Sequence, residues 1–236
     1  MSILSDLGAL LFPPRCPVCG TELHEEDRLF CMVCRTTAPM TGFCGKAANP
    51  LAERLRAEFP IEQASAFLWY VAGSGWQRAV HDLKYRGRWR TARELGLWYG
   101  SHLAESGLYA GVECVVPIPL HPRRLAGRGY NQAEYAAEGI AARLGVPLLR
   151  NAVKRRRDNP SQTTRSSAER WENVRDLFAV RRPELLAGRH LLLVDDVVTT
   201  GSTLLSCSEA ILRAVPSCRI SIAALAVSEH RFGLDR

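Results

Sequence analysis

The sequence predicts an α/β fold: a doubly wound, mostly parallel sheet with helices on both faces, preceded by a small module with four cysteines. Three observations predict this class. Strand-like and helix-like segments alternate over residues 64–227, which favours parallel strands joined by helical crossovers. Residues 191–203 (LLLVDDVVTTGST) join an apolar strand to two carboxylates and a small-residue loop. Two Cys-x-x-Cys pairs lie within residues 16–34.

Each element is expected from its local pattern. Short apolar or β-branched runs indicate strands at residues 64–72, 112–118, 146–149, 176–180, 191–194 and 219–227. Apolar residues spaced three and four apart indicate helices at residues 76–85, 91–105, 131–144 and 204–215. Residues 47–58 are expected to form a connecting helix or linker. Residues 1–16 lack a basic leader and predict a short packing helix rather than a signal peptide.

The chain length of 236 residues allows one α/β domain and a small additional module. We expect a zinc-ribbon-like module at residues 1–45, a connector at 46–62 and the sheet domain at 63–236. No run of about 18 apolar residues occurs, so we expect no membrane span and a cytoplasmic protein. The formal charge of +7 and the pI near 9.2 favour anionic partners, either phosphorylated small molecules or nucleic acid.

The cysteines predict a structural zinc site. Eight cysteines in a chain without a secretory signal indicate metal ligands or reduced thiols rather than disulfides. Four of them form two Cys-x-x-Cys knuckles, and each knuckle directs two sulfurs to one centre; the four are Cys16, Cys19, Cys31 and Cys34. Four ordinary buried thiols are the alternative interpretation. Cys44 and His24 are either substitute ligands or, more simply, surface and packing residues.

The run at 191–203 predicts a site for a phosphorylated sugar. Asp195 and Asp196 fall at the carboxyl end of a predicted strand, where open α/β sheets bind ligands. Hydroxyls and close-approach backbone N–H groups then precede a helix, which suits a phosphate monoester; they come from Thr199, Thr200, Gly201, Ser202 and Thr203. A Walker loop would need a lysine, and a haloacid dehalogenase phosphatase would need Asp-x-Asp; neither occurs here. The alternative is that the two acids only cap a turn.

This run resembles the thirteen-residue phosphoribosyl pyrophosphate motif of type I phosphoribosyltransferases. The resemblance implies a type I phosphoribosyltransferase-like fold. It also implies that Asp195 and Asp196, which we assign as the catalytic pair, hold the ribose hydroxyls while the loop binds the 5-phosphate. Release of pyrophosphate builds negative charge on the leaving group, so such an enzyme needs Mg2+ and fixed cationic donors.

A second segment supplies candidate cations for that leaving group. Residues 116–133 (VPIPLHPRRLAGRGYNQA) leave a predicted strand end as a loop that carries Arg123, Arg124 and Arg128. The guanidinium fork matches phosphate oxygens bidentately, so we expect these arginines to bind the pyrophosphate. The alternative is that they are merely solvated.

Several segments together resemble the ComF/GntX family. They are the two knuckles, residues 83–87 (LKYRG), residues 116–132 with the sequence RGYNQ, Gln162, Arg170 with Asn173, and the VDDVVTTGST run. Relatives often carry a further Cys-x-x-Cys, where this chain has only Cys44. The resemblance implies a role in natural competence, in which incoming single-stranded DNA is moved into the cytoplasm beside a helicase-like partner. It also adds Lys84 to the pyrophosphate side of the site.

Two hypotheses remain. In one, the protein binds phosphoribosyl pyrophosphate with Mg2+ as an adaptor in uptake of single-stranded DNA; in the other, it is an active phosphoribosyltransferase for an unidentified nucleobase or small-molecule acceptor, without a DNA role. Residues 84–90 (KYRGRWR) interleave cations with aromatics, as strand-binding surfaces do, and residues 154–157 add a basic cluster, although either segment can be a solvated face. Trp89 can equally be a core residue. Residues 159–175 predict either a mobile lid or plain disorder.

Overall fold

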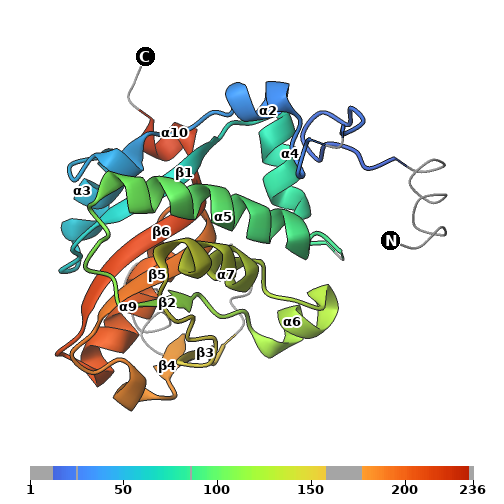
Figure 1. Cartoon of the computed structure of the whole chain (residues 1–236). Coiled ribbons are helices and arrows are strands. Elements are labelled where there is room, and N and C mark those ends of the chain that lie inside the picture. Colours follow the sequence, from blue (N-terminus) through green and yellow to red (C-terminus); the bar gives the residue numbers. More distant parts are fainter. Residues whose placement is uncertain (1–12, 25, 86, 158–176, 234–236) are drawn as a thin grey trace.

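The computed structural model of the protein describes residues 13–24, 26–85, 87–157 and 177–233. Most of the predicted N-terminal packing helix, Arg86, and the predicted lid with Gln162, Arg170 and Asn173 therefore lie outside the described residues. Figure 1 shows a twisted central sheet with helices packed against it.

The central sheet has four parallel strands in the order β1-β6-β5-β2. These are β1 (Ala64–Tyr70), β6 (Arg219–Ser228), β5 (His190–Val198) and β2 (Cys114–Pro117). A separate antiparallel pair consists of β3 (Val153–Arg155) and β4 (Phe178–Val180). The predicted strand at 146–149 is wrong in extent, because only Leu148 pairs, through one parallel bridge to Val115. The prediction of a mostly parallel sheet is confirmed.

Helices cover both faces of the sheet. The helices described are α2 (Met32–Thr36), α3 (Pro50–Arg56), α4 (Gly75–Asp82), α5 (Trp89–Ser106), α6 (Pro122–Arg128), α7 (Gln132–Leu144), α9 (Ser202–Ala214) and α10 (Glu229–Phe232), with short 3-10 turns η1 (Phe43–Gly45) and η2 (Pro183–Leu185). On β5, Leu191 and Leu193 pack in one core with α3 and α9. Leu192 and Val194 pack in the other, with α4, α5 and α7. This alternation along one strand is what a doubly wound sheet requires.

The cysteine-bearing segment packs directly on the sheet. Residues 39–41 run beside the edge strand β1, where Met40 forms an antiparallel bridge with Leu68 and Thr41 N donates to Phe67 O at 3.0 Å. Phe30 packs against Trp76 of α4 in a tilted arrangement, with ring centroids 5.2 Å apart. Within the described residues, no helix combines the length and apolar character that a bilayer crossing needs.

Two elements near the carboxyl ends of the strands differ from expectation. Residues 116–133 are not a continuous loop, because α6 forms within them. Pro122 occupies the first helical turn, His121 Nδ1 accepts a hydrogen bond from Arg123 N at 3.3 Å, and Gly129 ends the helix with φ 82°. Strand β5 continues to Val198, so the two aspartates lie within the last part of a strand rather than after it.

Candidate functional site

The four knuckle sulfurs form a cluster that fits zinc. The Sγ atoms of Cys16, Cys19, Cys31 and Cys34 all lie within 4.8 Å of one another. A tetrahedral ion with Zn–S bonds of about 2.3 Å would hold its sulfurs about 3.8 Å apart, so only small shifts are needed. The Cys19 and Cys31 sulfurs are already 3.6 Å apart. The four sulfurs therefore form a cluster at the place where the sequence predicts a structural zinc site.

The protonation of these thiols in the metal-free cluster is uneven. Hydrogen bonds with Thr21 lower the pKa of the exposed Cys19 to about 6. Burial raises the pKa of the Cys34 thiol, and neighbouring sulfurs raise it further. Zinc binding must displace a proton from Cys34, whereas Cys19 offers a thiolate readily. Among the residues that the structure describes, neither Cys44 nor His24 belongs to this cluster; Cys44 lies in η1 and is half-buried.

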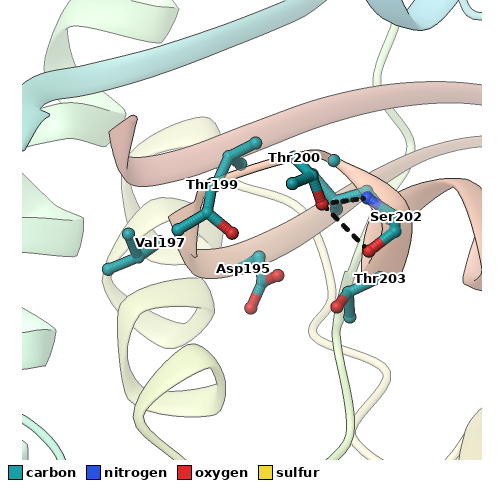
Figure 2. A pocket seen from close by; sticks show the side chains of 9 residues that line it. Asp195, Val197, Thr199, Thr200, Ser202 and Thr203 are labelled. Atoms are coloured by element: carbon teal, nitrogen blue, oxygen red, sulfur yellow. Dashed lines mark hydrogen bonds between the residues drawn. The ribbon is translucent and has the colours of Figure 1, made fainter. Parts of the chain in front are cut away.

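The phosphate loop joins β5 to α9. Thr199 and Thr200 follow the strand, Gly201 adopts φ 83° as the N-cap, and Ser202 begins the helix. Figure 2 shows the side chains grouped around this turn, where the Thr200 hydroxyl donates to Ser202 Oγ at 3.1 Å and accepts from Ser202 N at 3.4 Å. A small cavity here is lined by all five predicted loop residues and by Asp195. The N–H groups of a helix start and these hydroxyls suit a phosphate dianion.

A larger cavity of about 350 Å³ adjoins the loop and is here named the aspartate lobe. It brings together seven of the residues predicted from sequence: Lys84, Arg124, Arg128, Asp195, Asp196, Thr199 and Thr203. Its cations come from the turn after α4, from α6 and from β3, and its acids come from β5. Arg123 also lies in α6 but is not part of this lining.

The two aspartates differ in their surroundings. Asp195 Oδ1 accepts from Asp196 N at 2.9 Å. Burial, and next the charge of Asp196, raise the pKa of Asp195 well above its ordinary value. Asp196 instead accepts two hydrogen bonds, from Val197 N at 2.8 Å and from Gln132 Nε2 at 3.0 Å. Two carboxylates beside a phosphate site also fit Mg2+, which binds one or two carboxylates together with phosphate oxygens.

Supporting residues hold this arrangement from distant segments. The Tyr130 hydroxyl donates to Tyr85 O at 2.7 Å and also contacts Leu83 O, so it fixes the turn that carries Lys84. Gln132, the first residue of α7, is almost fully buried while its amide restrains Asp196. Because these pairs are more than 40 residues apart in sequence, only the fold brings them together.

Four polar residues that line the aspartate lobe have no sugar-site role in the sequence-based prediction: Tyr70, Asn131, Gln132 and Arg155. Gln132 and Asn131 were noted only as part of the RGYNQ resemblance, and Arg155 only as part of a basic cluster. Both Asn131 and Arg155 line the cavity, as does Tyr70 at the end of β1. The position of Tyr70 at a strand end was an available signal, whereas the antiparallel β3–β4 pair that contains Arg155 had no local signature.

Lys84 lines this cavity, and the two aromatic residues near it in the sequence, Tyr85 and Trp89, are partly exposed. Tyr85 is 58% exposed and Trp89 is 36% exposed. Trp89 packs against Tyr135 with ring centroids 5.3 Å apart, and the Arg90 guanidinium lies 5.2 Å from the Trp89 ring. Trp89 is therefore a surface aromatic with one covered face rather than a core residue.

Comparisons with known proteins agree with both parts of the chain. The family model "Phosphoribosyl transferase domain" matches residues 131–234, and "Double zinc ribbon domain" matches residues 7–61. Competence protein F of Haemophilus influenzae is 40% identical over 94 residues, which span 39% of this chain but only 41% of that protein. DNA utilization protein YhgH of Salmonella typhimurium is 31% identical over 213 residues, covering 86% of this chain and 93% of that protein. The chain belongs to the ComF family.

In this ComF-family protein the phosphoribosyl transferase match begins at Asn131, which caps α7, and ends after β6. It therefore includes both aspartates and the phosphate loop, while Lys84 and the α6 arginines precede it. A solved structure of glutamine phosphoribosylpyrophosphate amidotransferase from B. subtilis is similar with a TM-score of 0.44 and 16% identity, over 61% of this chain and 30% of that chain. The family-model match and the parallel sheet together give a phosphoribosyltransferase-type fold, as expected.

Proposed function

We propose that this ComF-family protein binds phosphoribosyl pyrophosphate with Mg2+ and acts in the uptake of single-stranded DNA during natural competence. The observation that carries the first part is the aspartate lobe, which joins two carboxylates, a phosphate loop and several cations in one cavity. Asp195 and Asp196 hold the ribose hydroxyls, and the loop 199–203 binds the 5-phosphate. Lys84, Arg124 and Arg128 face the pyrophosphate. Arg123, which lies in α6 with Arg124 and Arg128, adds positive charge on the same side. Mg2+, when bound, neutralises charge on the pyrophosphate.

The DNA role is supported by the relatives' names and by the exposed Tyr85, Trp89 and Arg90. One relative is named a competence protein and another a DNA utilization protein. Exposed aromatics next to cations suit a single strand, because bases stack on the rings while cations neutralise phosphates. In this proposal the protein works in the cytoplasm beside a helicase-like partner.

Titration calorimetry of phosphoribosyl pyrophosphate with Mg2+ tests the sugar site. We expect binding to the wild type and about 10- to 100-fold weaker binding by Asp195→Asn and Asp196→Asn, since each loses charge-assisted bonds to a hydroxyl. Glu113→Gln is the matched control: its carboxylate accepts from His190 N at 2.8 Å at the opposite end of the strands. Absence of binding to the wild type, or equal losses in the control, would refute the assignment.

Binding of a fluorescent single strand at several salt concentrations tests the DNA role. We expect the affinity to fall steeply with salt, and the Lys84→Ala/Arg86→Ala variant to reduce the log–log slope by about 0.7 for each lost phosphate contact. A salt-independent affinity would exclude this surface.

Pyrophosphate release over a panel of nucleobases separates the adaptor from an active transferase, because an adaptor binds without turnover.

A further inference from the structure

A second cavity, of about 210 Å³, adjoins the phosphate loop from the side of α3 and α10 and is here named the arginine lobe. Its lining consists of Pro50, Arg54, Thr199, Thr200, Arg231 and Phe232. Thr199 also lines the aspartate lobe, so ligands in the two lobes would lie next to each other. Neither the zinc site nor the sugar site uses the arginines of this lobe.

The arginine lobe is a cationic site. Arg54 comes from the last turn of α3, Arg231 comes from α10, and none of the described residues in the lining is acidic. Arg54 pairs with Glu58 at 3.4 Å, but both groups reach solvent, and such a pair holds its arginine weakly. Within the described part of the chain, Arg231 has no ion-pair partner. An anion in the lobe would therefore meet an Arg231 that is unpaired among the described residues and an Arg54 whose only described ion pair is an exposed, weak one.

The wall of this lobe is fixed against the phosphate loop. Asn49 caps α3 by accepting from Ala52 N at 3.0 Å and donates to Ala64 O of β1 at 2.9 Å. A Cβ on Gly201 would lie only 3.0 Å from Leu55 Cδ2, so α3 touches the loop closely. Pro50 and the buried Phe232 add apolar surface. A ring with an anionic group fits this lining, because arginine binds carboxylates and stacks on rings, and Pro50 and Phe232 supply apolar contact.

We propose that the arginine lobe binds the acceptor of a phosphoribosyl transfer, and that this acceptor is a planar heteroaromatic carboxylate. The inference rests on the proposed sugar site. Because Thr199 lines both lobes, an acceptor in the arginine lobe lies next to the sugar whose C1 it attacks. A ring nitrogen donates its lone pair to C1 while the C1–O bond breaks, and pyrophosphate leaves with that electron pair. Where the nitrogen carried a hydrogen, its proton passes to solvent.

Matched ligand pairs test the charge requirement. Nicotinate and nicotinamide differ by one carboxylate, as do orotate and uracil, and each is titrated by calorimetry with and without phosphoribosyl pyrophosphate and Mg2+. We expect at least one acid to bind about 10- to 100-fold more tightly than its neutral partner, as charge-assisted hydrogen bonds from arginine allow. Equal affinities within both pairs, or binding of neither acid, would overturn the proposal.

Arginine variants test the location. Arg54→Gln and Arg231→Gln are expected to weaken the acid about tenfold each while they leave the affinity for phosphoribosyl pyrophosphate within about twofold. Arg182→Gln, an exposed arginine outside both lobes, is the matched control. Loss of acid binding in the control, or no loss in either lobe variant, would place the acid elsewhere. Failure of phosphoribosyl pyrophosphate to bind the wild type would refute the sugar site. The acid titrations made in the absence of phosphoribosyl pyrophosphate would still test whether the arginine lobe binds the acid.

Discussion

Replacement of Asp195 by Asn is expected to stabilise the ligand-free protein even though it weakens sugar binding. Burial, followed by the charge of Asp196, raises the pKa of Asp195 well above the ordinary value of 3.8. A carboxyl group whose pKa rises on folding stabilises the native state fully below its unfolded pKa, and this contribution is lost as the pH rises through the folded pKa. At neutral pH the wild type has lost this contribution to its free energy of unfolding. The amide introduced by Asp195→Asn does not titrate, so the stability of the variant does not fall with pH in this way.

The size of the effect follows from this difference in proton binding. The stability advantage of Asp195→Asn grows above about pH 4 by up to about 1.36 kcal/mol for each pH unit, until the folded pKa is passed. In a protein of this size, 1 kcal/mol shifts Tm by roughly 2–4 °C. The amide oxygen keeps the acceptor position that Asp195 Oδ1 offers to Asp196 N at 2.9 Å, so the substitution need not remove a hydrogen bond.

Asp196→Asn provides the contrast in the same assay. Both Asp196 oxygens accept hydrogen bonds, from Val197 N and Gln132 Nε2, and an amide has only one acceptor oxygen. One donor therefore loses its partner, which costs about 1–3 kcal/mol. Thermal melts of both variants between pH 5 and 9, at constant salt and zinc, measure these effects. A lower Tm for Asp195→Asn than for the wild type at pH 8, or a difference that does not change with pH, would refute the reasoning.

Four further variants test other parts of the structure. Gly201→Ala should cost about 1–2 kcal/mol in urea unfolding and weaken ribose 5-phosphate binding, because Gly201 has φ 83° and an added Cβ would lie 3.0 Å from Leu55 Cδ2; unchanged affinity would exclude a phosphate role for the loop. Gly139→Ala should cost about 3 kcal/mol, because its Cβ would lie 2.3 Å from a backbone oxygen of α5; a Tm near that of the wild type would contradict the close helix contact. Cys34→Ser should lower both zinc content by mass spectrometry and Tm, and full zinc retention would exclude it as a ligand. Lys84→Ala should weaken phosphoribosyl pyrophosphate more than ribose 5-phosphate in calorimetry, and equal losses would remove it from the pyrophosphate side.

The sequence predicted the part of the site that is contiguous in the chain. Asp195, Asp196 and the loop 199–203 lie within nine residues, so one strand, one turn and one helix start suffice to position them. The Gln132 to Asp196 hydrogen bond was not predictable in this way, because it joins residues 64 apart. The contribution of Arg155 depends on the β3–β4 pairing, whose strands have only three residues each.

The fold was predicted best where burial dominates and worst where capping or edge effects decide. Strands β5 and β6 bury nearly continuous apolar runs, and both were expected. Helix α6 buries no residue, so it has no hydrophobic period to detect. Its signals were instead Pro122 at the first turn and Gly129 after the last, which indicate a short helix. The segment at 146–149 lies at the outer edge of β2, where a single bridge satisfies the pairing.

The two halves of the sugar site depend on structural elements of different stability. The aspartates and the phosphate loop are positioned by β5, which is paired on both sides within the sheet, and by the long helix α9. Lys84, Arg124 and Arg128 come from a turn and from a helix with no buried residue, which can open locally without unfolding the sheet. At low denaturant concentration the protein should therefore still bind ribose 5-phosphate. Under the same conditions it should no longer bind phosphoribosyl pyrophosphate more tightly than ribose 5-phosphate. Selectivity between phosphoribosyl pyrophosphate and ribose 5-phosphate then depends on the order of the turn at Lys84, which Tyr130 holds through its hydroxyl.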